Sequence, residues 1–398
     1  MKIIIIGNGR VGSVLSRLLL GERNIKLITC CDLEIKNRIK NKKINYKRID
    51  AGLKNQLFKL FRNTEADLVV NASLPVFNAN ILEICLGSKT NYLDLNSYWD
   101  FDPNPKSKSP YKVEQLDYDS KFKQAGLFGL INAGVSPGLT NLLAKQSTEY
   151  FDRIDRVKIR LYEDTGSEEL FFAWSKKWTL DEIYWKPLVW RKEKFQLRDN
   201  FSDEEEYNFP KPYGRKKVCL ISQEEVSTVP LFIKTKNLDI KSFDNQLPVS
   251  KLLLGLDLLS EEKVKVNGRI IIPQEIISEI IPDTLEISHN KNIQNAIFGM
   301  VVDTEGKKDG KPRRIKQSVF FPFQKEVDKL GLGGGANFIS YPTALMAKLF
   351  ISSRPFIRKK GIIPPEALDE KARRNIFHGL GKRGVRIENF LSEKNCEI

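Results

Sequence analysis

The sequence predicts an α/β protein in which a doubly wound parallel sheet is followed by a second, α+β domain. Three observations predict this. Apolar strand-like runs alternate with helix-like patterns through about the first 130 residues, a glycine-rich turn joins the first strand to the first helix, and the alternation stops after Asn132. A length of 398 residues suits two domains.

The first strand is predicted at Lys2–Ile6, a continuous apolar run typical of a strand covered on both faces. A helix follows over Val11–Leu20, where apolar residues recur with helical spacing. Further strands are predicted at Ile25–Cys31, Tyr46–Ile49, Leu68–Asn71 and Tyr92–Leu95, and further helices through Leu57, Leu60 and Phe61 and over Asn80–Leu86. This alternation implies parallel strands joined by right-handed crossovers.

The second part of the chain has a different pattern. Strands of a more antiparallel sheet are predicted at Arg156–Tyr162, Lys216–Ile221, Leu231–Thr235 and Ala296–Asp303, and helices at Ser250–Leu259 and Tyr341–Ile351. The aromatic stretch Trp174–Trp190 is expected to be a loop. We expect the first domain to cover residues 1–132 and the second, a substrate and dimerisation domain, residues 133–340.

Composition excludes several classes of protein. The chain has 41% hydrophobic residues, enough for buried cores, and no apolar run near the ~18 residues of a bilayer span. Its net charge of +15 comes without a nucleic-acid-binding motif, so a solvated basic surface is favoured over nucleic-acid binding. Five scattered cysteines and two isolated histidines (His289 and His378) predict neither disulfides nor a metal site. We expect a soluble, cytoplasmic protein.

The glycine-rich turn has the residues Gly7, Asn8, Gly9, Arg10, Val11 and Gly12 and fits G-x-G-x-x-G. The first glycine allows a tight turn, the second allows a pyrophosphate to approach the backbone, and the third allows close packing of helix on strand. Asp32 ends the second strand about 20 residues later, where a carboxylate holds the ribose hydroxyls. Together these features predict a Rossmann dinucleotide-binding domain.

The cofactor is expected to be NAD or NADP. Asp32 favours NAD because a carboxylate repels a 2′-phosphate, whereas Lys36 and Arg38 could neutralise one. Dinucleotide binding alone does not make an enzyme, and a non-catalytic regulatory domain that senses NAD(P) is the alternative from another class.

Candidate site residues lie where the predicted strands end. Asp94 ends a strand at the carboxyl edge of the sheet, where ligands bind, and is our candidate acid–base group or amine anchor. A helix-capping or turn role is the alternative for Asp94. Tyr98 is close enough in sequence to share its site. Asn71 and Ala72, at the end of another strand, are candidates for the nicotinamide side of the cofactor site.

Four segments carry a resemblance to a known family: Leu68–Pro75, Asn91–Leu95, Asn132–Ala144 and Lys360–Glu366. The element Ala133-Gly134 followed by Pro137-Gly138, Asn141 and Ala144 is the most specific of them. With these segments the chain resembles the saccharopine dehydrogenase-like family, the group of saccharopine reductase, lysine 6-dehydrogenase and carboxynorspermidine dehydrogenase. Gln223 departs from the family, in which a histidine often stands at this position.

The resemblance implies NAD(P)-dependent hydride transfer at the C–N bond of an amino acid or polyamine derivative, and it implies that residues 341–398 pack back on the first domain. An opine-type dehydrogenase is an alternative. Candidate substrate residues are Gly138 and Thr140, whose helix amides suit a carboxylate, together with Asn141, Trp174, Arg191 and Glu225. A homodimer is expected, since two-fold dimers are the commonest oligomers.

Overall fold

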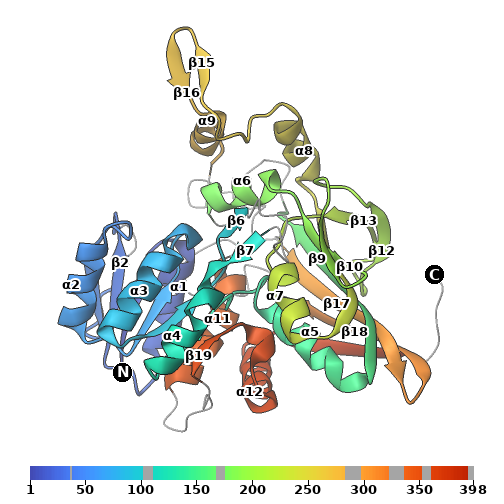
Figure 1. Cartoon of the computed structure of the whole chain (residues 1–398), viewed down its shortest axis with the longest axis horizontal. Helices are drawn as coiled ribbons and strands as arrows, with labels where there is room; N and C mark the ends of the chain where they lie inside the picture. The colour runs from blue at the N-terminus through green and yellow to red at the C-terminus, as the bar shows by residue number, and fades with distance from the viewer. Residues whose placement is uncertain are drawn as a thin grey trace. The chain divides into compact units, whose positions relative to one another are not determined.

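A computed structural model of the chain describes residues 1–35, 38–101, 111–166, 175–282, 297–321, 336–351 and 360–392 (Figure 1). The chain divides into two compact units. Unit 1 comprises residues 1–146, 227–233 and 337–383, and unit 2 comprises residues 147–226, 234–336 and 384–398. The predictions for Lys36, Trp174 and His289 lie outside the described residues.

Unit 1 is built on a parallel sheet, which has seven strands in the described part of the chain, in the order β19-β8-β5-β4-β1-β2-β3. The strands are β1 (Lys2–Ile6), β2 (Leu27–Asp32), β3 (Ile44–Arg48), β4 (Leu68–Asn71), β5 (Asn91–Asp94), β8 (Phe128–Leu130) and β19 (Gly361–Ile363). This confirms the predicted doubly wound sheet. The predicted strands agree with β1 and β4 residue for residue and with β2, β3 and β5 within a few residues.

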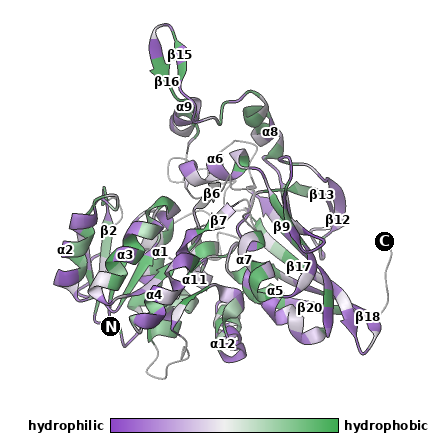
Figure 2. Ribbon diagram, viewed as in Figure 1, coloured by the Kyte–Doolittle hydropathy of each residue, from purple (hydrophilic) through white to green (hydrophobic). Residues whose placement is uncertain are grey.

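Helices and one short hairpin complete unit 1. They are α1 (Arg10–Leu20), α2 (Lys54–Thr64), α3 (Asn78–Ser88), β6 (Trp99–Phe101), β7 (Tyr111–Val113), α4 (Asp119–Gln124), α5 (Leu139–Ser147), α7 (Glu225–Phe232), α11 (Ala336–Ile351) and α12 (Glu370–Gly381). Apolar side chains of α2 and α3, among them Leu57, Phe61 and Leu82, pack with Val69 and Tyr92 of the sheet in one buried cluster. Figure 2 shows the resulting contrast between hydrophobic β2 and the mixed surface of α2.

Unit 1 continues beyond residue 132, where we placed the boundary, and takes in two later segments. The reason is a set of buried hydrogen bonds between distant parts of the chain. Asn141 on α5 donates its amide to Glu366 (3.0 Å) and to Thr228 on α7 (3.4 Å), and the Thr343 hydroxyl on α11 donates to the carbonyl of Ala133 (2.7 Å). These hydrogen bonds make α5, α7 and α11 part of the unit that contains the parallel sheet.

Unit 2 contains a mixed sheet with nine strands among the described residues, and seven of them form the path β11-β10-β14-β9-β17-β18-β20. β13 pairs with β14 and β12 with β13; β9 and β14 run parallel, and the other pairs are antiparallel. The strands are β9 (Arg153–Asp164), β10 (Leu188–Arg191), β11 (Lys194–Leu197), β12 (Glu205–Asn208), β13 (Arg215–Leu220), β14 (Thr235–Asp244), β17 (Ile297–Lys308), β18 (Lys311–Phe320) and β20 (Arg386–Ser392).

Three helices and a separate hairpin accompany this sheet. They are α6 (Lys176–Tyr184), α8 (Leu247–Gly255), α9 (Pro273–Ile280), β15 (Val264–Val266) and β16 (Arg269–Ile271). Leu180, Leu259 and Ile281 form a small buried cluster against which these helices pack. None of the described helices is both long and apolar enough to span a bilayer.

Three predictions in the second part of the chain were wrong. Leu231 and Phe232 end helix α7, and the Ile233 amide continues it by donating to the carbonyl of Val229 (2.8 Å), so the strand begins only at Thr235. Short apolar runs do not distinguish strand from helix. The stretch expected to be a loop contains α6 and β10, and the predicted helix Ser250–Leu259 ends at Gly255, before the left-handed Asp257 (φ 57°).

Candidate active site

The glycine turn lies between β1 and α1, and two of its glycines are sterically required. Gly7 has a φ of +94°, and a Cβ there would come 2.4 Å from the carbonyl oxygen of Ala72. A Cβ on Gly12 would come 1.8 Å from the carbonyl oxygen of Gly7. A Cβ on Gly9, in contrast, would meet nothing within 4 Å.

The open position beside Gly9 is what the predicted pyrophosphate site requires. Gly9 is the N-cap of α1 and provides no side-chain cap, so the first-turn amides of Arg10, Val11 and Gly12 face an uncapped helix end. Such an end, with its positive dipole, is where phosphates bind. The loop residues predicted from the sequence therefore include an uncapped helix N-terminus and a glycine with open space beside it, as a phosphate site requires.

Asp32 is fixed beside this loop. Its Oδ2 accepts a hydrogen bond from the backbone amide of Asn8 (2.6 Å) and its Oδ1 one from the amide of Leu33 (2.8 Å). Arg48, its neighbour in register on β3, donates Nε to the carbonyl of Leu33 (3.0 Å). The predicted ribose-binding carboxylate thus lies at the end of β2, with a cation on the adjacent strand.

The carboxyl ends of β4 and β5 bring Asn71 and Asp94 side by side, because these two residues are partners in register. The Asn71 amide donates to Oδ1 of Asn78 (2.7 Å), which also accepts from the Tyr92 hydroxyl (2.8 Å). Ala72 follows β4 and lies against Gly7. The predicted cofactor residues of β1 and β4 therefore meet at one edge of the sheet.

Asp94 is 1% exposed. Its Oδ1 accepts a hydrogen bond from the backbone amide of Asn132 (2.7 Å), and its Oδ2 accepts one from Nε2 of Gln115 (3.1 Å). Burial raises the pKa of Asp94 from 3.8 to about 7, although these hydrogen bonds act in the opposite direction. A carboxyl with a pKa near neutrality suits proton transfer. Tyr98 lies half-buried in the loop that follows β5.

The segment with the most specific resemblance forms a buried turn. Gly138 has a φ of +132°, and a Cβ there would come 2.2 Å from the carbonyl oxygen of Gly134. Its amide donates to Oδ1 of Asn141 (2.8 Å), and the Thr140 hydroxyl donates to the carbonyl of Val135 (3.5 Å). Gly138, Thr140 and Asn141 are thus engaged with groups of unit 1 itself.

Unit 2 contains a group of carboxylates that the sequence reasoning missed, which we call the carboxylate group: Glu163, Glu182, Glu225 and Asp244. Glu163 and Asp244 are partners in register near the ends of the parallel strands β9 and β14. Glu182 lies on α6 and accepts from Nε2 of Gln223 (3.2 Å). Glu225 is the buried first residue of α7, whose first two residues belong to unit 2. Of the four, only Glu225 was predicted as a site residue.

The electrostatics of the carboxylate group indicate mutual repulsion. Burial, and next the charge of Asp244, raise the pKa of Glu163 to about 8. Burial, and then Glu163 and Glu225, raise the pKa of Glu182 well above its usual value. Burial raises the pKa of Asp244 to about 6, with Asp164 adding to it. Among the described residues, the charged neighbours that shift the pKa values of Glu163 and Asp244 are carboxylates.

Arg191 is not brought together with the carboxylate group. It pairs in register with Asn237, seven residues before Asp244 on β14, which corresponds to roughly 23 Å along the strand. Its guanidinium forms an ion pair with Asp203 (2.5 Å). Glu163 and Asp244 were missed because the parallel pairing of β9 with β14 leaves no signal in the sequence of either strand.

The described residues contain no cluster of three or more His, Cys, Asp or Glu arranged to hold a metal ion.

Comparisons with known proteins show which proteins this chain is similar to. The family described as "Saccharopine dehydrogenase NADP binding domain" matches residues 3–130. The chain is 29% identical over 341 residues to a carboxynorspermidine synthase of Vibrio cholerae. This alignment covers 79% of this chain and 80% of that protein. It is 26% identical over 330 residues to a carboxyaminopropylagmatine dehydrogenase of Synechocystis, covering 78% and 79% of the two chains.

A solved structure has the same fold. Saccharopine dehydrogenase (L-Glu forming) of Saccharomyces cerevisiae matches with a TM-score of 0.69 and 13% identity, over 98% of this chain and 99% of that one. The described architecture, a parallel dinucleotide-binding sheet followed by a mixed sheet, is therefore shared over nearly the whole chain.

Proposed function

We propose that the chain is a saccharopine dehydrogenase-like, NAD(P)-dependent oxidoreductase of amines and that its substrate is a carboxylated polyamine derivative. The observation that carries the proposal is the carboxylate group of unit 2. Two relatives named for carboxylated polyamines support it independently.

A polyamine complements the carboxylate group by charge. Its ammonium groups would bind between carboxylates that otherwise repel one another, and each close pair would favour the ionised acid. A substrate whose far end carries carboxylates, as saccharopine does, would add to the repulsion. The charge of this region therefore favours a polyamine derivative over an amino-acid derivative.

In the proposed reaction an aldehyde and a primary amine condense to an imine with loss of water, and reduction of the imine yields a secondary amine. The nicotinamide, when bound, supplies the hydride that reaches the imine carbon. The nitrogen must gain a proton in the same reduction, and Asp94, whose pKa is about 7, is the proposed acid–base group of unit 1. Tyr98 is the proposed second donor near it.

The experiment that tests the function follows reduced-nicotinamide absorbance with purified protein and a panel of substrates. The panel contains carboxynorspermidine, carboxyaminopropylagmatine, saccharopine, lysine and a simple opine, each with NAD and with NADP. Oxidation of a carboxylated polyamine and of no amino-acid derivative is expected. Turnover of saccharopine or the opine alone would contradict the polyamine assignment, and nucleotide binding without any turnover would favour a sensor.

Glu182→Gln is expected to raise the KM for the polyamine about tenfold to a hundredfold and to change kcat little, because it removes a charge that contacts an ammonium group and not the reacting carbon. Steady-state kinetics at saturating cofactor measure both constants. Glu206→Gln, which removes an exposed carboxylate of β12 paired with Arg215, is the matched control and should leave KM unchanged. An unchanged KM in Glu182→Gln would exclude Glu182 from substrate binding.

NAD is proposed as the preferred cofactor because Asp32 repels a 2′-phosphate. In Asp32→Ser, kcat/KM with NADP divided by kcat/KM with NAD is expected to rise about tenfold or more. The repelling carboxylate is then gone, and Arg48 on the adjacent strand can pair with the 2′-phosphate. Asp50→Ser, an exchange in the loop after β3, is the control. A wild-type preference for NADP would contradict the proposal.

A further inference from the structure

A segment of unit 2, residues 261–282, forms what we call the arm: the hairpin of β15 and β16 followed by α9. Val266, Asn267, Gly268 and Arg269 form its turn, where Asn267 and Gly268 have φ values of 49° and 80°, as a two-residue type I′ turn requires. In the described part of the chain these two strands pair only with each other. Figure 1 shows the hairpin projecting beyond α9, α6 and α8.

The arm exposes large aliphatic side chains. Val264 and Val266 are 43% and 44% exposed, and Ile270 and Ile280 reach 69% and 70%. Figure 2 shows that hydrophobic residues occur along the hairpin itself. A lone two-stranded hairpin is only marginally stable in water, so a hairpin with this composition is expected to gain stability when another surface covers it.

Helix α9 holds the arm on unit 2 by one face and leaves the other face open. The Gln274 amide donates to Oδ1 of Asp181 on α6 (2.9 Å), and Ile277 packs against the buried cluster of Leu180 and Leu259. Ile276 and Ile280, four residues apart, share the open face.

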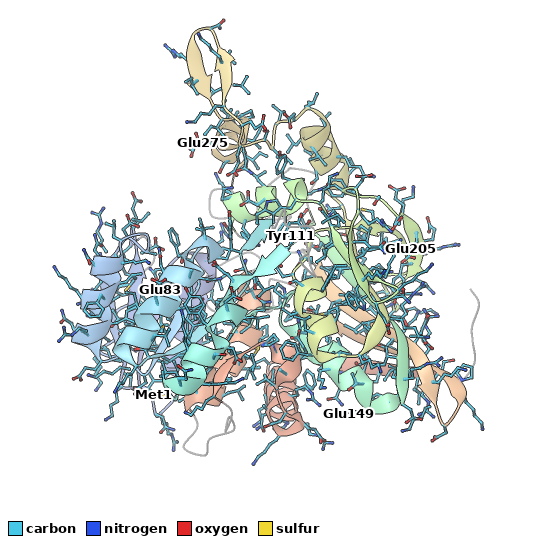
Figure 3. The ribbon with its side chains drawn as sticks, in the orientation of Figure 1. Met1, Glu83, Tyr111, Glu149, Glu205 and Glu275 are labelled. Atoms are coloured by element: carbon cyan, nitrogen blue, oxygen red, sulfur yellow. The ribbon has the colours of Figure 1, made fainter. Side chains whose placement is uncertain are left out.

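The hairpin and helix α9 carry charges of opposite sign, and Glu261 and Glu262 precede the hairpin. The hairpin carries Lys263, Lys265 and Arg269, and α9 carries Glu275, labelled in Figure 3, and Glu279. Among the described residues these five side chains form no ion pair; the ion pair that the arm does form joins Glu261 to Lys177 (2.7 Å). The basic hairpin and the acidic helix thus have opposite charges that are not neutralised by ion pairs within the described part of one chain.

We propose that the arm docks on the arm of a second copy of this chain, with the hairpin of each copy against α9 of the other. A surface that carries both charges in separate places is complementary to itself under a two-fold rotation. The exposed aliphatic side chains provide several hundred Å² of apolar surface per copy, and the paired charged side chains extend this toward the ~800 Å² per partner of a standard interface.

The proposal is independent of the proposed function, because it is tested by mass and not by activity. Light scattering after gel filtration of the full chain is expected to give twice the mass of one chain. Ile270→Glu combined with Ile280→Glu is expected to give a monomer with unchanged circular dichroism. Phe390→Glu, at a 50% exposed position on β20, is the matched control and should remain dimeric.

A charge exchange tests directly whether the hairpin of one copy meets α9 of the other. One variant carries Lys263→Glu, Lys265→Glu and Arg269→Glu, and the other carries Glu275→Lys and Glu279→Lys. Each alone should be monomeric, and an equimolar mixture should recover a mixed dimer, since each acidic hairpin then meets a basic helix. A monomeric wild type would overturn the proposal and indicate another occupant of the arm. A dimer that survives the arm variants, or dissociates on Phe390→Glu, would overturn it as well.

Discussion

Gly12→Ala is expected to prevent stable folding of unit 1, whereas Gly9→Ala is expected to fold normally and lose cofactor affinity. The Cβ at position 12 would overlap the backbone of Gly7 (1.8 Å to its carbonyl oxygen) and not a flexible side chain, which costs about 3 kcal/mol or more. The Cβ at position 9 would enter open space, where we place the pyrophosphate, and would weaken NAD(P) binding about tenfold to a hundredfold.

Thermal unfolding and the Kd for NADH and NADPH, measured by nucleotide fluorescence, distinguish the two variants. Gly21→Ala is the matched control, because Gly21 caps the same helix at a φ of −69° and a Cβ there would meet only the carbonyl oxygen of Leu18, at 3.9 Å. Wild-type affinity in Gly9→Ala would show that the dinucleotide does not approach the backbone at this glycine.

Asp94→Asn is expected to reduce kcat by a factor of about 10²–10⁴ without loss of stability at pH 8. The amide occupies nearly the same volume and still accepts from the amide of Asn132, and Gln115, whose buried Oε1 has no hydrogen-bond partner in the described structure, can rotate to accept from the new amide. The variant therefore removes the titrating group and keeps two hydrogen-bond partners for the new amide, although the rotated Gln115 no longer donates to Ser97 and Asn96.

The pH dependence of stability has a definite sign. The pKa of Asp94 rises from 3.8 in the unfolded chain to about 7 in the folded one, so the contribution of the protonated group is complete below pH 3.8 and is lost as the pH rises to about 7. The full loss is about 4 kcal/mol. Asp94→Asn lacks this loss, and its free energy of unfolding relative to wild type should increase from pH 4 to pH 8.

Denaturant unfolding at several pH values and the pH profile of kcat test the two parts separately. Asp67→Asn, an exposed carboxylate immediately before β4 at the other edge of the sheet, is the control for both. If Asp94→Asn retained the wild-type kcat and pH profile, Asp94 would have only the turn role that the sequence left as its alternative.

The arrangement of the glycine turn and Asp32 in unit 1 could be predicted from the sequence because its signals are local. The glycine turn requires residues only five apart, and β1 and β4 are short apolar runs between turn residues. Asp32 follows from its position at the end of the next predicted strand, about 20 residues after the turn. Each of these features is determined by backbone conformation or by periodicity within a dozen residues. The same holds in principle for the Asn267-Gly268 hairpin turn, a local signal from which we made no prediction.

The carboxylate group of unit 2 required the tertiary structure. Glu163 and Asp244 are 81 positions apart and meet only because β9 and β14 pair in parallel, which neither strand's own sequence indicates. Asn141 and Glu366 are 225 positions apart. Their buried hydrogen bond connects Asn141, a predicted substrate residue, to a distant segment of unit 1. Local periodicity decides which segments become strands and helices. The partners of a strand and the neighbours of a buried polar group depend instead on contacts between distant segments. In this protein, those contacts decide where the buried carboxylates lie.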